Sequence, residues 1–215
     1  MPRISVCVPT WNRGHLLQYS IQSLIDQMFK DFEIIVVDDG STDNTKQVLT
    51  KLLEREPRLK CIYLKHQGIV PTLWAGNEAA TGEIIVKHDS DDMSMPDRLS
   101  KIDQYFKENP DTEIMYAGVY QTYESDDYLF RRIYIPALPI DKERLFREQY
   151  IPGFFAYTKK FITEVPYRKS YCSEDWMLIL DAVFKNRKIG YLDQGLYEYA
   201  MRVDSNSLRW EGTGA

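Results

Sequence analysis

The sequence predicts an α/β fold built on a mostly parallel central sheet flanked by helices. Short apolar runs alternate with amphipathic stretches through the first half of the chain. The continuous β-branched run from Phe32 to Val37 is typical of a strand covered on both faces. Strands that alternate with helices imply right-handed crossovers and therefore parallel neighbours. From about residue 113 the pattern is less regular and predicts a mixed α+β second half.

The elements of the first half follow one another in order. Expected strands are Ile4–Val8, Phe32–Val37, Leu59–Leu64 and Glu83–His88. The first expected helix places Leu17, Ile21, Leu24, Ile25 and Met28 on one face. The second follows the N-cap residues Ser41, Thr42 and Asp43 and buries Val48, Leu49, Leu52 and Leu53. The third is Pro71–Ala80, closed by Gly82, and the fourth begins at Pro96.

The second half predicts a hairpin and two helices. Its strands are Tyr116–Tyr123 and Tyr128–Ile135 around the polar turn Glu124–Asp127. The helices lie near Asp141–Gln149 and Trp176–Asn186. No stretch rich in Gly, Ser or Pro separates the halves, so we expect one domain, 1–215, with halves 1–112 and 113–215.

Composition restricts the classes of function. The 215 residues are 44% hydrophobic and 27% charged, as in soluble globular proteins. Lys and Arg number 27 against 32 Asp and Glu, and the net charge of -5 argues against a general binder of nucleic acid or anionic membrane. An anionic substrate would have to be attracted by a metal ion or by a few placed cations.

Cysteine usage and hydropathy favour a cytoplasmic protein. The cysteines, Cys7, Cys61 and Cys172, are odd in number and match no metal-binding spacing, which fits a reducing compartment. The start of the chain lacks the apolar stretch of a secretory signal. The longest aliphatic run, Ile34–Val37, is far shorter than the ~20 residues of a membrane span. We therefore expect a cytoplasmic protein without a transmembrane segment. It would reach any membrane-bound partner from outside the bilayer, at the membrane face.

Polar clusters follow three of the expected strands. They are Pro9–Arg13, Asp38–Ser41 and Asp89–Asp92. Ligands of open parallel sheets bind outside the carboxyl ends of the strands. Neither a Gly-x-Gly-x-x-Gly turn nor a Gly-Lys-Ser/Thr phosphate loop occurs, so the common dinucleotide and phosphate-loop sites are excluded. The remaining candidate is a site rich in carboxylates.

The acidic cluster Asp89-Ser90-Asp91-Asp92 has two interpretations. Acidic residues after a strand often form turns and cap helices. Two acids separated by one residue can also share a hard divalent cation that keeps positions for phosphate oxygens. Such an ion bound to a diphosphate would stabilise departing negative charge as a Lewis acid.

An ordered set of motifs resembles the inverting glycosyltransferases of family two, which have the A-type, Rossmann-like nucleotide-sugar fold (GT-A). Each motif is weak alone, but their order and spacing cover roughly residues 4 to 205. The set comprises Val8–Arg13, Val36–Asp43, Asn77, Thr81–Glu83, Asp89–Asp92, Met95–Leu99 and Ser173–Trp176.

The resemblance implies a metal-dependent enzyme of glycan or polysaccharide biosynthesis. It would move a sugar, with inversion, from a nucleotide diphosphate donor, a UDP-sugar being favoured, to a hydroxyl acceptor. The acceptor would be a glycan, a lipid-linked sugar or another hydroxyl compound, and the cofactor Mn2+ or Mg2+. Residues 1–112 would bind the nucleotide sugar, and 113–215 would supply the acceptor site and catalytic base. The sugar, the acceptor and whether the protein forms a homo-oligomer stay open.

The resemblance also implies roles for individual residues. The expected nucleotide-sugar contacts are Pro9, Thr10, Arg13, Asp38, Asp39, Asn77, Asp91 and Arg202. Arg13 would pair with phosphate, and Asp38 or Asp39 would accept the imino hydrogen of a uracil-type base, the other one capping the turn. Trp11 stacks on the base or is plain packing. Asn77 faces the donor or is a buried helix residue satisfied locally.

The metal ligands expected from the resemblance are Asp89, Asp91, Asp92 and Asp204. Asp89 and Asp91 have the Asp-x-Asp spacing, and which two acids coordinate is open. Many relatives carry, after the base, an Arg and, two residues later, a His that helps to bind the metal or diphosphate. This chain has Arg202 but places Asp204 in the position of that His. Whether Asp204 coordinates is therefore open as well.

Asp175 is the expected catalytic base, and Glu174 is the less favoured neighbour. Direct displacement at an anomeric carbon needs a group that takes the proton of the attacking hydroxyl. The alternative is that Ser173-Glu174-Asp175 simply begins a helix, where acids favour the macrodipole. Both can hold, because a helix N-terminus keeps a carboxylate ionised.

Two rival functions and several other residues complete the predictions. A sugar-phosphate nucleotidyltransferase would need a Gly-rich, Arg-containing loop in place of Pro9–Arg13. A non-catalytic nucleotide-sugar-binding or scaffold protein is disfavoured by the acids and weakly favoured by the missing His. The histidines His15, His66 and His88 are interpreted as solvated or structural, His66 being nearest the expected nucleotide edge. The aromatic residues before the base form either an acceptor platform or core: Tyr150, Phe154, Phe155, Tyr157, Tyr167 and Tyr171.

Overall fold

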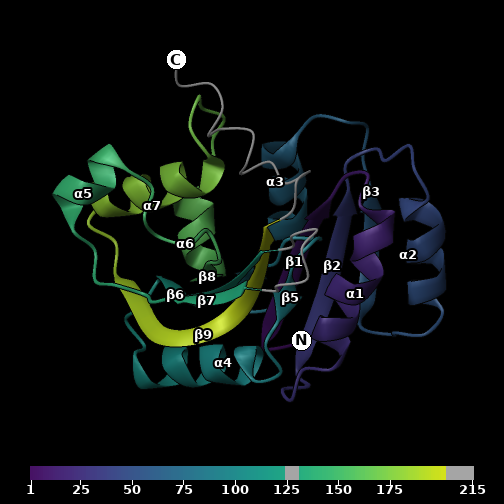
Figure 1. The fold of residues 1–215 in the computed structure, drawn as a ribbon, viewed down its shortest axis with the longest axis horizontal. Coiled ribbons are helices and arrows are strands. Elements are labelled where there is room, and N and C mark those ends of the chain that lie inside the picture. Colours follow the sequence, from purple (N-terminus) through teal and green to yellow (C-terminus); the bar gives the residue numbers. More distant parts are fainter. Residues whose placement is uncertain (124–130, 202–215) are drawn as a thin grey trace.

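A computed structural model describes residues 1–123 and 131–201, and the strands in this part of the chain form one sheet (Figure 1). The strands are β1 (Ile4–Thr10), β2 (Phe32–Asp38), β3 (Leu59–Tyr63), β4 (Ile84–Lys87), β5 (Met93–Ser94), β6 (Ile114–Tyr123), β7 (Arg131–Ile135), β8 (Ala156–Thr158) and β9 (Ile189–Met201). The helices are α1 (Gly14–Ile25), α2 (Thr45–Leu53), α3 (Ile69–Ala79), α4 (Arg98–Glu108), α5 (Lys142–Arg147), α6 (Lys159–Glu164) and α7 (Glu174–Phe184).

The sheet changes character along its width. Its order is β3-β2-β1-β4-β8-β6-β9-β5, with β7 paired to β6. Strands β3, β2, β1 and β4 are parallel, as the alternation of strands and helices predicts. Strand β8 then lies antiparallel between β4 and β6, and β9 runs parallel to β6. The predicted α/β class, with a Rossmann-like first half and a mixed second half, is confirmed.

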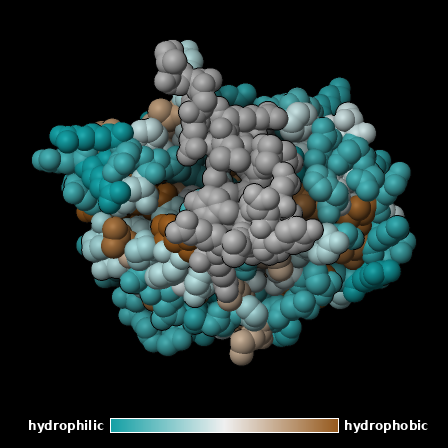
Figure 2. Space-filling view, viewed as in Figure 1, coloured by the Kyte–Doolittle hydropathy of each residue, from teal (hydrophilic) through white to brown (hydrophobic). Residues whose placement is uncertain are grey.

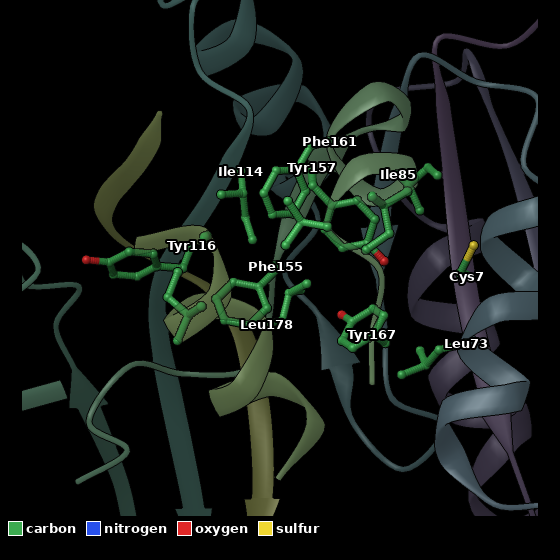
Figure 3. Packing of buried hydrophobic residues seen from close by; sticks show 14 of the residues in the cluster. Cys7, Leu73, Ile85, Ile114, Tyr116, Phe155, Tyr157, Phe161, Tyr167 and Leu178 are labelled. Carbon is green, nitrogen blue, oxygen red and sulfur yellow. The ribbon is translucent and has the colours of Figure 1, made fainter. Parts of the chain in front are cut away.

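Helices cover both faces of the sheet, and each face has its own core. Successive residues of β1 point to opposite faces, so Val6 and Cys7 belong to different clusters. Helices α1, α2 and α4 cover the Val6 face. Helices α3, α5, α6 and α7 cover the other face, where Tyr157, Phe161 and Leu178 pack together (Figure 3). The cluster in Figure 3 draws on both halves of the chain, which therefore share one core.

Two local expectations are corrected by the structure, and three elements were not predicted. Helix α1 ends at Ile25, because the chain then turns and the Met28 N–H donates to the Pro96 carbonyl, leaving Met28 exposed. Leu53, expected inside, is exposed at the end of α2. The sequence pattern carried no signal for β8, α6 or the long β9. The hairpin is confirmed by the antiparallel pairing of β6 and β7, and its turn lies outside the described residues.

On the face drawn in Figure 2, most coloured atoms are hydrophilic and the hydrophobic ones form separate patches. Among residues 1–123 and 131–201, no helix combines the length and the apolarity needed to cross a membrane.

Candidate functional site

Loops after β1, β2 and β4 meet at the carboxyl edge of the parallel strands. The Asp39 N–H donates to the Thr10 carbonyl at 2.9 Å, which ties the second loop to the first. The Asn12 N–H donates to Ser41 Oγ at 2.8 Å. Arg13 Nε lies 3.3 Å from Asp91 Oδ2, which ties the first loop to the acidic cluster. The structure thus brings together the three polar clusters found in the sequence.

Asp38 and Asp39 have different surroundings, although both are buried. Asp38 Oδ1 accepts hydrogen bonds from the Ser41 N–H, at 3.0 Å, and from its hydroxyl, so it caps the turn after β2. Asp39 accepts from the backbone N–H groups of Gln67 and Gly68, at 2.9 and 2.8 Å. Asp39 thereby fixes the loop after β3, where Gly68 has a φ of 93° that favours glycine.

A flat aromatic surface lies beside Asp39. The rings of Trp11 and His66 stack with centroids 4.4 Å apart and planes at 16°. His66 Nδ1 is 2.8 Å from Asp39 Oδ2, which orients the imidazole. Trp11 is 48% exposed, so its indole is open to a ligand rather than packed in the core.

The acidic cluster divides into exposed and buried members. The side chains of Asp89 and Asp91 are 28% and 27% exposed, whereas Asp92 is buried. Tyr197 on β9 accepts the Asp89 N–H at 2.8 Å, and the Ser20 hydroxyl donates to the Asp89 carbonyl at 3.1 Å. Both backbone groups of Asp89 are therefore held, while its carboxylate stays accessible.

The accessible acids suit a divalent cation that keeps open positions. Asp89 and Asp91 offer hard carboxylate oxygens from alternate residues of one loop. Within residues 1–123 and 131–201, no group of three or more His, Cys, Asp or Glu side chains is placed to hold a metal ion. A metal ion bound to Asp89 and Asp91 would therefore need further ligands, which phosphate oxygens of a substrate could supply. Arg202 and Asp204, both predicted site residues, lie outside the described residues.

A buried arginine, Arg98, holds the residues on both sides of the acidic loop. Arg98, in the first turn of α4, donates to the Lys87 carbonyl at 2.8 Å and to Ser94 Oγ at 3.0 Å. It also lies 3.0 Å from His88 Nδ1. Burial, aided by Arg98, lowers the pKa of His88 well below its usual value, so the ring is neutral and accepts at Nδ1. His88 is thus structural, one of the two interpretations that the sequence allowed.

Asp175 lies in the first turn of α7, facing β4. Ser173 caps the helix by accepting the Trp176 N–H at 3.2 Å, so the helix-start interpretation is also correct. Lys87 Nζ donates to Asp175 Oδ2 at 2.7 Å, while the buried Oδ1 has no hydrogen-bond partner among the described residues. Burial raises the pKa of Asp175 above its usual value, so the helix N-terminus alone does not keep this carboxylate ionised as expected; the adjacent Lys87 charge opposes the shift and favours the ionised form. A raised pKa suits a carboxylate that accepts a proton.

Lys87 is a site residue that the sequence analysis missed. It ends β4, and its side chain is only 3% exposed. Its ammonium is 3.2 Å from Asp89 Oδ1 and 3.7 Å from Glu174 Oε1, besides its bond to Asp175. Burial disfavours the charged form, but these acids raise the pKa of Lys87 well above its usual value. A lysine that ends an apolar strand directly before an acidic cluster was the available signal.

Several other candidates belong to the core. Asn77 is buried and its Oδ1 accepts the Tyr157 hydroxyl at 2.9 Å, while its Nδ2 is buried without a partner among the described residues, so the predicted local satisfaction holds for the oxygen alone. Phe155, Tyr157 and Tyr167 are core residues, and Tyr171 is fully exposed. Only part of the proposed aromatic platform is therefore at the surface.

Comparisons with known proteins point to one family. The model of glycosyl transferase family 2 matches residues 5–169. A GalNAc(5)-diNAcBac-PP-undecaprenol beta-1,3-glucosyltransferase of Campylobacter jejuni is 41% identical over 106 residues, which are 48% of this chain and 34% of that protein. The glycosyltransferase GlyG of Streptococcus pneumoniae is 25% identical over 94% of this chain and 72% of its own. An uncharacterized glycosyltransferase of Nostoc sp. is 37% identical over 53% of this chain and 36% of its own length, so this chain matches only about a third of some curated relatives.

Solved structures share the fold. S. aureus TarS 1–349 in complex with UDP-GlcNAc has a TM-score of 0.75 at 21% identity, covering 94% of this chain and 60% of that one. The mannosyltransferase PcManGT from Pyrobaculum calidifontis, in complex with GDP-Man and Mn2+, has a TM-score of 0.73 at 16% identity and covers 97% and 59%. At these identities the likeness concerns the GT-A fold alone.

Proposed function

Since this chain belongs to glycosyl transferase family 2, we propose that it transfers a sugar from a nucleotide diphosphate, a UDP-sugar, to a hydroxyl acceptor with inversion. One observation carries the proposal. The buried carboxylate of Asp175 lies near the loop that carries Asp89 and Asp91. Lys87 joins them, because its ammonium contacts both Asp175 and Asp89. A proton acceptor thus faces a cation-binding loop across one site.

The reaction is a single displacement. The acceptor oxygen attacks the anomeric carbon, and the bond from that carbon to the diphosphate oxygen breaks with its electron pair leaving on the diphosphate. The hydroxyl proton passes to the carboxylate of Asp175, whose ionised form is favoured by the adjacent Lys87 ammonium. A bound Mn2+ or Mg2+ supplies neutralisation of the diphosphate charge when present. Attack from the face opposite the leaving group inverts the configuration.

The nucleotide would occupy the edge formed by the loops after β1, β2 and β3. Trp11, stacked on His66 and half exposed, offers a face for the base. Asp39 lies beside that face, which favours it over the turn-capping Asp38 as the acceptor of a uracil imino hydrogen. Arg13, beside Asp91, would pair with phosphate, and Pro9 and Thr10 are the buried last residues of β1, directly before this loop.

The accessible carboxylates of Asp89 and Asp91 would hold the cation, and the buried Asp92 is the weaker candidate. The proposal of UDP rests on the Asp39 site and is supported by the similar fold of TarS, which was solved in complex with UDP-GlcNAc. The Mn2+ in the PcManGT complex supports a divalent ion. A glycan or lipid-linked acceptor is in keeping with the name of the Campylobacter jejuni glucosyltransferase.

Nucleotide sugars tested with and without Mn2+ would decide the matter. We expect UDP and one UDP-sugar to raise the melting temperature in the presence of Mn2+ more than GDP does, since a ligand of the folded state stabilises it. The same UDP-sugar should release UDP in a reaction stopped by a chelator. Binding without turnover against a broad acceptor panel would instead support a non-catalytic nucleotide-sugar-binding protein, and absence of binding would contradict the proposal.

A further inference from the structure

Lys87 occupies an unusual place for a lysine. Alternation along β4 puts Val86 in the core of the α1 side and Ile85 in the core of the α7 side. Lys87 shares the face of Ile85 and therefore points under the first turn of α7. An ammonium so deeply buried is costly to desolvate and needs well-placed partners.

Its backbone leaves it little freedom. The Lys87 N–H donates at 3.0 Å to the carbonyl of Phe155, which directly precedes β8, and its own carbonyl accepts from Arg98 at 2.8 Å. The position of the ammonium is thus set by β4, by the start of β8 and by α4. The acids around it come from two other places, the loop after β4 and the helix α7.

The contact with Asp175 leaves that carboxylate asymmetric. Oδ2 accepts from Lys87, whereas Oδ1 is buried without a partner among the described residues. Gly153 closes the other side, since a Cβ there would lie 2.2 Å from Asp175 Oδ2. One oxygen is anchored between a lysine and a glycine, and the other remains for a proton.

We propose that Lys87 is a positioning residue that anchors Asp175 through Oδ2, leaves Oδ1 for the acceptor proton, and links the base to Asp89 of the acidic loop. The inference rests on the proposed function and extends it to a residue from neither acidic motif. Lys87 sets the distance between the base and the donor-side loop without binding the nucleotide. Its loss should therefore impair turnover more than donor binding.

The test compares Lys87→Met and Lys87→Arg with Lys60→Met. Lys60 is the control, because it is also a strand lysine paired with a buried carboxylate, Glu33; it lies away from the site and its side chain is 57% exposed. UDP release would be measured with UDP-glucose, UDP-galactose and UDP-N-acetylglucosamine in Mn2+, and UDP affinity by calorimetry. We expect Lys87→Met to lower kcat about 100-fold, as loss of alignment does. KM for the donor and Kd for UDP should stay within threefold of wild type.

An arginine at position 87 restores the positive charge and should restore part of the alignment of Asp175. Lys87→Arg should recover at least tenfold of the lost kcat, and if Lys87→Met does not fold, Lys87→Arg alone should lower kcat with an unchanged KM. A kcat within tenfold of wild type for Lys87→Met, a parallel loss of UDP affinity, or an arginine variant no better than methionine would overturn the positioning role. Wild-type protein that neither binds UDP nor releases it would overturn the proposed function itself, and the positioning role with it.

Discussion

Two buried carboxylates, at opposite edges of the sheet, show how differently the molecule uses the same chemical group. Glu33 lies near the start of β2, at the amino edge of the parallel strands, and Asp175 faces the carboxyl edge. Each is paired with a lysine, Lys60 at 2.6 Å and Lys87 at 2.7 Å. Burial disfavours the ionised form of both.

Hydrogen bonding separates the two. Glu33 Oε1 accepts from the hydroxyls of Ser5 and Thr81 and from the Thr81 N–H, at 2.6, 2.6 and 2.8 Å. Burial alone would raise the pKa of Glu33, but these bonds and Lys60 outweigh it and lower the pKa to about 2. Asp175 Oδ1 has no hydrogen-bond donor among the described residues, and burial raises the pKa of this carboxyl group. The satisfied carboxylate of Glu33 joins strands, whereas the unsatisfied carboxylate of Asp175 is the one that we propose takes part in the chemistry.

Asp175→Asn tests the reactive member of the comparison. We expect transfer or UDP release to fall roughly 10³-fold, because the amide cannot take the acceptor proton. UDP affinity should stay within a few-fold. Steady-state kinetics with the UDP-sugar selected by the screen, and calorimetry with UDP, measure both. Asp181→Asn, at a partly buried position of the same helix that pairs with Arg168, is the control and should retain activity. Near-normal turnover by Asp175→Asn would remove Asp175 as base.

Glu33→Gln tests the structural member. The variant keeps the shape of the side chain but loses its charge. We expect the free energy of unfolding to fall by about 2–3 kcal/mol. Solvent at the exposed Lys60 screens part of the attraction within the ion pair and limits the loss. Urea denaturation measures the change. Turnover per folded molecule should be unaffected. Glu83→Gln, at an exposed position, is the control, and its free energy of unfolding should fall by less than about 0.5 kcal/mol. A loss of activity in Glu33→Gln without a loss of stability would contradict the purely structural role of Glu33.

Acid should destabilise the amino edge in a defined direction. The folded pKa of Glu33, about 2, lies below its ordinary value of 4.5, so the unfolded chain takes up the proton first. The stabilisation is complete above the ordinary pKa and is lost as the pH falls from about 4.5 toward 2. Denaturation series between pH 7 and about 3 should show a shallower decline for Glu33→Gln than for wild type. Equal slopes would mean that Glu33 is not the responsible group.

Gly153→Ala is the smallest and most local change. Its Cβ would lie 2.2 Å from Asp175 Oδ2, so the carboxylate must move. We expect kcat to fall about tenfold, with unchanged UDP affinity, since small misplacements of a base are costly. Gly76→Ala serves as the control, because its Cβ would come no closer than 3.4 Å to any neighbour. Identical kcat values for the two variants would indicate that Asp175 has room to adjust.

Local sequence patterns predicted the parallel half of the fold well and the mixed half less well. Strand β2 and helix α1 could be read from periodicity, because burial on both faces or on one face leaves a pattern. Strand β9 could not, because Gly195 interrupts its sequence and the pairing with β6 shifts register near Gly118. The three-residue β8 is too short to leave any pattern.

The candidate site shows the same division. Residues at the ends of β1, β2 and β4 were identifiable because strand order alone brings them together. Lys87 was not, since its proposed role depends on Asp175, which is 88 positions away. Arg98 bonds to the carbonyl of Lys87 at the end of β4, and Tyr197 bonds to the backbone N–H of Asp89 in the acidic loop; no local pattern marks such contacts.

The bond between Tyr197 and Asp89 also affects the order in which the molecule can be completed. These residues are 108 positions apart, and Tyr197 lies on β9, the last strand of the described chain. On a ribosome the acidic loop emerges long before the hydroxyl that holds it, because synthesis proceeds at about 5–20 residues per second. A nascent chain can therefore build its parallel strands and still lack a rigid acidic loop until β9 has been added.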